Sequence, residues 1–173
     1  MFFRRLFACS MMSVVVLFGF GCAKAPESTP VVLKTYSNEQ YGIIFDYPEN
    51  METKDRTESR MMKYAGLDVD FFASLRDIKR EVKATNIAAI YAAKALTTDQ
   101  FVTALGTLGA NAQIKNTQTE VYHGLTVKKI VTSTDIGSDK TYYVLERNGN
   151  LVIFSVFLGQ ETFFESVLQT LRP

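Results

Sequence analysis

The stretch LVIFSVFL, residues Leu151 to Leu158, decides the fold class of this sequence. Apart from Ser155, every residue in it is apolar, so an extended strand formed by it would need cover on both faces. Strands that are apolar on both faces are typical of the centre of a sheet, whereas a strand with one wet face alternates. We therefore predict a sheet with this strand at its centre and further layers on both sides.

The sequence upstream of this strand contains a run of hairpins. Asn148 and Gly149 stand between two alternating segments, which is a strong short-range hairpin signal. His123 with Gly124, and the polar stretch from Asp135 to Asp139, separate the earlier segments in the same way. The strands expected here are Gln113 to Val121, Leu125 to Thr134 and Lys140 to Arg147. Short turns make consecutive strands antiparallel.

The first part of the domain also contains strand patterns. Tyr41 to Pro48 alternates and ends at a proline, and Leu67 to Leu75 alternates more cleanly. Between them, Glu52 to Arg60 is so rich in charge that we expect a loop. Asn86 to Lys94 is Ala-rich and could form a helix, but its alternation and the helix start that follows favour a strand.

Two helices are expected. Thr97 and Gln100 have the spacing of a capping box and would open a helix over Thr98 to Leu108. Thr162 and Glu165 have the same spacing and would open the last helix. Together with a central strand covered on both faces, these helices predict the α+β class, as an α/β/α sandwich with a central antiparallel sheet covered by helices.

The N-terminal segment has the anatomy of a secretory signal. Arg4 and Arg5 precede fifteen uncharged residues, Leu6 to Phe20, and then Gly21 and Cys22. As a helix, fifteen residues span about 23 Å, which is short of the ~30 Å hydrocarbon core of a bilayer. A permanent transmembrane anchor is therefore the weaker interpretation.

The end of that segment, Gly19 to Cys22, resembles the lipobox of bacterial lipoproteins. The resemblance implies acylation of Cys22 and cleavage just before it. The alternative is an ordinary signal peptide with a chance cysteine. The polar, Pro-containing stretch AKAPESTP that follows favours a lipid-held tether. We expect a signal peptide over 1–21, a tether over 22–35 and one domain over 36–173, anchored in the bacterial cell envelope and facing the periplasm or exterior.

Composition excludes several function classes. Nineteen Lys and Arg against eighteen Asp and Glu leave a net charge of +1, so no nucleic-acid partner is expected. One His and two Cys are too few for a zinc finger or a disulfide scaffold, and Cys9 would leave with the signal. The sequence has no G-x-S-x-G, Walker A, C-x-x-C or H-E-x-x-H motif. We expect no catalytic residues, no cofactor and no enzyme activity.

A few side chains remain as candidate sites. Asp68 and Asp70 would lie about 6.6 Å apart on one strand face and could hold a hard cation with a third ligand, although solvated carboxylates are commoner. Phe72, Tyr142 and Tyr143 would form either a docking patch or part of the core, and core packing is favoured. His123, the only histidine, is expected to be a polar turn residue.

The order of these features resembles a known family. YSNEQYGIIFDYPENM (36–51), the strands and helix that follow, and the closing ETFFESVLQTLRP (161–173) are similar to PsbP-like domains, which include photosystem extrinsic subunits and bacterial lipoproteins. The resemblance covers residues 36–173. The chain has no Trp, which favours the non-photosynthetic branch. The resemblance implies an α/β/α sandwich without general catalytic residues that works as an extrinsic accessory or assembly subunit on a membrane complex.

Three functional hypotheses follow. The first is a monomeric, non-enzymatic envelope protein, held in the membrane by acylated Cys22, that docks on an unidentified membrane protein complex. The second is a carrier of a small ligand or lipid with an apolar cavity. The third is a hydrolase that uses carboxylates brought together in a cleft.

Overall fold

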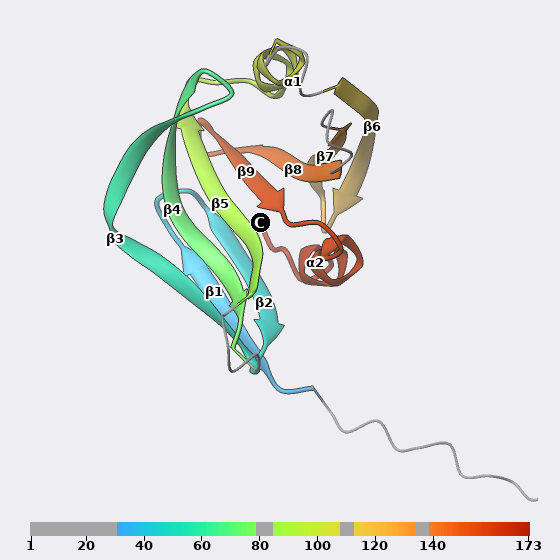
Figure 1. Ribbon diagram of the computed structural model, residues 1–173. Helices are drawn as coiled ribbons and strands as arrows, with labels where there is room; N and C mark the ends of the chain where they lie inside the picture. The colour runs from blue at the N-terminus through green and yellow to red at the C-terminus, as the bar shows by residue number, and fades with distance from the viewer. Residues whose placement is uncertain (1–30, 79–84, 108–112, 134–138) are drawn as a thin grey trace, which may run out of the picture. The chain divides into compact units, whose positions relative to one another are not determined.

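The computed structural model describes residues 31–78, 85–107, 113–133 and 139–173. They form a seven-stranded sheet and a separate two-stranded hairpin (Figure 1). All strand pairs among these residues are antiparallel. From edge to edge, the large sheet consists of β3 (Met51–Tyr64), β4 (Leu67–Asp77), β5 (Thr85–Lys94), β9 (Asn150–Val156), β8 (Asp139–Arg147), β7 (Leu125–Ser133) and β6 (Gln113–Tyr122).

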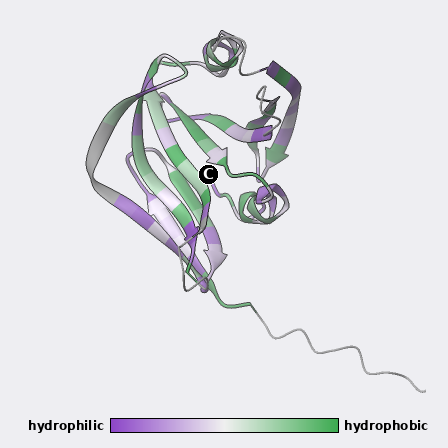
Figure 2. Cartoon of the chain, viewed as in Figure 1, coloured by the Kyte–Doolittle hydropathy of each residue, from purple (hydrophilic) through white to green (hydrophobic). Residues whose placement is uncertain are grey.

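Strand β9 lies at the centre of the sheet, which confirms the prediction from its apolar sequence. It is paired with β5 on one side and with β8 on the other, and all of its residues are buried. Val152 and Phe154 belong to the core on one face, and Leu151 and Ile153 belong to the core on the other. The hydropathy colouring shows the same contrast, because β9 is mostly hydrophobic whereas the edge strand β6 is largely hydrophilic (Figure 2).

One face of the sheet is covered by a β hairpin and a helix. The hairpin consists of β1 (Leu33–Asn38) and β2 (Ile43–Pro48), and the helix is α2 (Glu161–Leu168). The ring centroid of Phe154 in β9 lies 6.3 Å from that of Phe45 in β2 and 5.3 Å from that of Phe164 in α2. All three rings are almost completely buried, so hairpin, sheet and helix share one core.

Helix α1 (Thr98–Gly106) covers part of the opposite face. Phe101 and Leu105 are fully buried there, and the Phe101 ring lies 5.8 Å from Tyr142 of β8. The predicted capping box is confirmed, since the Gln100 N–H donates to Thr97 Oγ1 and the Thr97 N–H donates to Gln100 Oε1 at 2.9 Å. Leu108, the last residue of the predicted helix, lies outside the described residues.

The expected α/β/α sandwich covered by helices is wrong. The described chain is mostly antiparallel strand, and its two helices have only nine and eight residues. The β1–β2 hairpin supplies much of the cover that the prediction gave to helices. Strand β1 begins at Leu33, inside a stretch whose polar and Pro-rich neighbours favour a tether, so the local sequence does not indicate the first strand of the hairpin.

Two local expectations are also corrected. Glu52 to Arg60, expected as a loop, belongs to β3, an edge strand whose only neighbour in the sheet is β4. In β4 the register shifts between Phe71 and Ala73, so the alternation breaks there. Val69 faces one core, whereas Ala73 and Leu75 face the other. A β-bulge adds one residue to a strand and thereby reverses the faces of those that follow.

The signal peptide over 1–21, Cys22 and most of the expected tether lie outside the described residues. Within the described ranges, neither α1 nor α2 has the length and apolar character needed to cross a bilayer.

Candidate docking surface

The two candidate metal-binding carboxylates have different surroundings. Asp68 is solvent-exposed and forms an ion pair with Lys63, with Nζ and Oδ1 2.7 Å apart. Asp70 is buried, and its Oδ2 accepts a hydrogen bond of 2.6 Å from the Tyr41 hydroxyl at the tip of the β1–β2 hairpin. Burial and this bond to a carboxylate raise the pKa of Tyr41. Each carboxylate therefore has its own protein partner. No cluster of three or more potential metal ligands occurs among the described residues.

The three aromatic residues considered for a docking patch are all buried. Phe72 stacks against Tyr41 with ring centroids 4.4 Å apart, and Tyr143 packs on Phe164 of α2. Tyr142 lies on the opposite face of the sheet, where its hydroxyl accepts a hydrogen bond from Tyr64. The structure thus separates these rings between two cores and leaves them almost no exposed surface. This arrangement agrees with the core-packing alternative.

Glu165 in α2 ties this helix to the sheet. Its Oε1 lies 2.5 Å from the Lys129 Nζ of β7 and accepts a 2.8 Å hydrogen bond from the Tyr143 hydroxyl of β8. The hydrogen bond from Lys129 holds the pKa of Glu165 below its usual value.

The capping box predicted for α2 from Thr162 and Glu165 is wrong. The observed N-cap is Gln160, and it makes no side-chain capping hydrogen bond.

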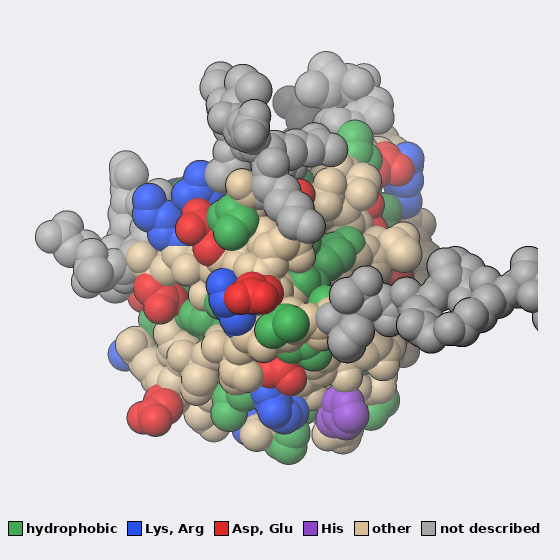
Figure 3. Space-filling model, turned by 90° about the horizontal axis from the view of Figure 1, so that it is seen from below, with side chains coloured by type: hydrophobic (Ala, Val, Ile, Leu, Met, Phe, Trp, Pro, Cys, Tyr) green, Lys and Arg blue, Asp and Glu red, His purple; other side chains and the backbone are tan. Residues whose placement is uncertain are grey.

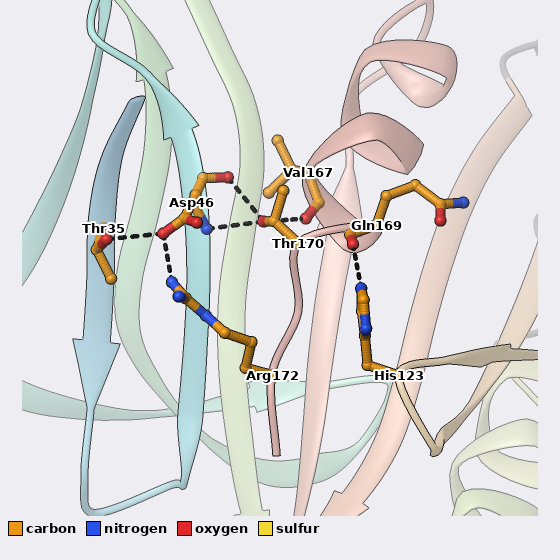
Figure 4. Close-up of polar contacts among 7 residues, drawn as sticks. All are labelled: Thr35, Asp46, His123, Val167, Gln169, Thr170 and Arg172. Atoms are coloured by element: carbon orange, nitrogen blue, oxygen red, sulfur yellow. Dashed lines mark hydrogen bonds and ion pairs between the residues drawn. The ribbon is translucent and has the colours of Figure 1, made fainter. Parts of the chain in front are cut away.

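The chain after α2 is fastened to the β1–β2 hairpin by a cluster that we call the C-terminal clasp: Thr35, Asp46, Thr170 and Arg172 (Figure 4). The Asp46 N–H donates to Thr170 Oγ1 at 2.7 Å, and its carboxylate accepts hydrogen bonds from Thr35 and Arg172. The Arg172 N–H donates to the Ile44 carbonyl at 2.9 Å. Thr170 and Arg172 are each more than 120 residues from Asp46 in sequence, so no local pattern could have predicted the clasp.

His123 lies in the turn between β6 and β7, as expected, with a positive φ of 47°. Its Nε2 is 2.7 Å from the carbonyl oxygen of Gln169, the C-cap residue of α2 (Figure 4). Because a carbonyl only accepts hydrogen bonds, this contact requires a proton on Nε2. In this arrangement Nε2 donates to the backbone and is not free to act as a base, so the histidine anchors the helix end.

A surface pocket of about 350 Å³ lies where the β5–α1 connection meets the β8–β9 turn. Its lining is mixed and includes Glu146, Arg147 and Asn148. Glu146 already accepts hydrogen bonds from the Thr98 N–H at 2.8 Å and from the Thr98 hydroxyl at 3.0 Å. This mixed lining, which includes charged side chains, differs from the apolar cavity expected of a lipid carrier.

Besides the isolated Met61 and Val121, the exposed large apolar side chains of the described residues fall into two groups that the sequence did not single out. One group, which we call the N-terminal apolar patch, consists of Val31, Val32, Leu33 and Ile78. The other, which we call the connector pair, consists of Phe157 and Leu158 between β9 and α2, with 43% and 63% of their surfaces exposed. Exposed apolar residues that are next to each other are candidates for contact with a partner.

No protein-family model matches this chain, and no curated protein matches it significantly. Its structure is similar to the solution structure of cyanobacterial PsbP (CyanoP) from Synechocystis sp. PCC 6803. The TM-score is 0.53 and the sequence identity is 14%, over 87% of this chain and 98% of the other chain. At this identity the similarity establishes the architecture, and the chain therefore has a PsbP-like fold.

Proposed function

We propose that this protein is a lipid-anchored, non-enzymatic accessory or assembly protein of the cell envelope that docks on a membrane protein complex. The observation that carries the proposal is the PsbP-like fold, which extends over nearly the whole length of the matched cyanobacterial chain. PsbP-like domains, as the sequence resemblance implies, work as extrinsic subunits. The lipobox-like end at Cys22 supports attachment to a membrane from the N-terminal side.

The polar side chains of the described domain support a non-enzymatic role. His123 donates to a backbone carbonyl, Glu165 is held by Lys129 and Tyr143, and Asp46 belongs to the C-terminal clasp. Each of these groups joins one element of secondary structure to another. Catalytic acids and bases instead converge on a space that a substrate can enter.

The connector pair is the surface that we propose for contact with the protein partner. Its two side chains follow a fully buried strand, and the backbone there is fixed because the Phe157 N–H donates to the Ile87 carbonyl at 2.9 Å and the Phe157 carbonyl accepts from Gln160 at 3.0 Å. Apolar side chains on a rigid backbone lose little conformational entropy on binding and are therefore effective contact residues.

The proposal is tested by affinity capture from host membranes solubilised in mild detergents, with and without prior crosslinking. We expect the wild-type chain to capture a membrane complex, and Leu158→Ser to capture less of the same complex. Val121→Ser is the matched control, since Val121 is 67% exposed and lies in β6. Recovery of the bait alone under all conditions, or equal capture by the two variants, would contradict the proposal.

Lipid attachment is tested separately by fractionation. We expect Cys22→Ser to leave the membrane fraction after a high-salt wash, whereas Cys9→Ser, in the segment expected to be removed, should remain there. Membrane retention of Cys22→Ser would show that another part of the chain holds the protein in the membrane.

A further inference from the structure

The N-terminal apolar patch lies at one end of the domain. The Glu49 N–H donates to the Val32 carbonyl at 2.9 Å, and the Ile78 N–H donates to the Asn50 carbonyl at 3.3 Å. Since Glu49 and Asn50 are neighbours, these bonds place the start of β1 beside the end of β4. The four exposed aliphatic residues are thereby brought to the same end of the domain.

These side chains are more exposed than aliphatic residues in a folded domain usually are. The exposed fractions are 68% for Val31, 60% for Val32, 52% for Leu33 and 47% for Ile78. Lys34 follows directly, and its Nζ donates to the exposed Glu49 carbonyl at 3.2 Å. Figure 3 views the molecule from below, from the end at which the described chain begins in Figure 1, and shows hydrophobic side chains at the surface beside charged ones.

The short segment between Cys22 and Val31 limits what can cover this patch. Val31 lies nine residues after Cys22. Nine residues span at most about 31 Å even when fully extended. If Cys22 carries the lipid, the patch is always held within this distance of the bilayer surface. At such a high effective concentration, weak apolar contacts are enough to hold one end of a domain on the surface.

We propose that the N-terminal apolar patch rests on the lipid bilayer, so that this end of the domain lies in the membrane interface and α1, at the opposite end in Figure 1, faces away from it. This inference depends on the proposed lipid anchor at Cys22. It adds an orientation, since the lipid alone would leave the domain free to tumble at the surface.

The test uses the full-length lipoprotein, purified from membranes and reconstituted in vesicles of phosphatidylethanolamine and phosphatidylglycerol. After processing, an introduced cysteine should be the only free thiol. Leu33→Cys and Ile78→Cys are labelled with a polarity-sensitive fluorophore. Met61→Cys is the matched control, because Met61 is also an exposed aliphatic residue, at 63%, and lies up to about 33 Å along β3 from Met51.

We expect the fluorophores at positions 33 and 78 to shift to the blue on reconstitution, and lipids that carry a quencher in the acyl chain to quench them several-fold more than the one at position 61. Equal quenching at all three positions, with the protein still in the vesicle fraction, would overturn the orientation while leaving the anchor intact. A protein that does not float with the vesicles would overturn both the anchor and the orientation.

Discussion

Replacement of Phe154 by alanine tests the central feature of the fold, the core shared by sheet, hairpin and α2. Phe154 is fully buried, and its ring contacts Phe45 and Phe164, which come from two other elements. Burying an aromatic side chain removes roughly 200 Å² from water, which at about 25 cal/mol per Å² stabilises the fold by about 5 kcal/mol. An alanine side chain retains part of this stabilisation, so we expect Phe154→Ala to lower the free energy of unfolding by about 3–5 kcal/mol.

This loss is large compared with the total stability of about 5–15 kcal/mol that is typical of a domain. It is measured by urea unfolding and by thermal unfolding of the unlipidated Cys22→Ser chain, both monitored by far-ultraviolet circular dichroism. We expect the melting temperature to fall by roughly 10 °C. Phe157→Ala is the control, because Phe157 immediately follows β9 in sequence but is 43% exposed, and it should cost no more than about 1.5 kcal/mol. Equal costs for the two variants would refute the shared core.

Three further predictions concern the contacts that hold the domain together. Gly42→Ala should lower the free energy of unfolding by about 1 kcal/mol more than Gly124→Ala. Both glycines have a positive φ, but a Cβ at position 42 would come within 2.5 Å of Asn148 and 3.0 Å of Arg147, whereas position 124 is open. Equal unfolding midpoints for the two variants would contradict this. Thr170→Val should lower the free energy of unfolding by about 1–3 kcal/mol because the Asp46 N–H loses its acceptor. Thr162 is exposed, so Thr162→Val should change the unfolding midpoint little. Glu165→Gln should destabilise the domain by about 1 kcal/mol or less at neutral pH. The pKa of Glu165 is lowered in the folded state, so its carboxylate stabilises the fold above the ordinary Glu pKa, and this contribution disappears as the pH falls through the lowered value. The difference from wild type should therefore vanish in acid, and a difference that persists there would show that charge is not the cause; Glu39→Gln, at an exposed position, is the control.

Strong local signals in the sequence predicted the corresponding elements correctly. The apolar run in β9 indicated a central strand because burial on both faces leaves no position for polar residues. Asn148 and Gly149 form the expected turn and have positive φ values of 49° and 71°, as a tight hairpin requires. Thr97 and Gln100 cap α1 as their spacing indicates. Each of these features depends only on residues that are close together in the chain.

The features that were missed depend on distant partners or on exposure. Glu165 has the spacing of a capping residue, but Lys129 and Tyr143 from two strands engage its carboxylate instead. The charged stretch in β3 resembles a loop because edge strands tolerate polar residues. For the N-terminal apolar patch, an apolar triplet at Val31 to Leu33 was visible in the sequence, but only the structure shows that Ile78 lies at the same end of the domain.

A role as an accessory subunit is checked by native electrophoresis of host membranes solubilised in a mild detergent, with immunodetection of this chain. We expect the wild-type protein to migrate with a membrane complex much larger than itself, and Leu158→Ser to move to the position of the isolated chain. Wild-type protein that migrates only at the position of the isolated chain, even after crosslinking, would contradict a role as an accessory subunit.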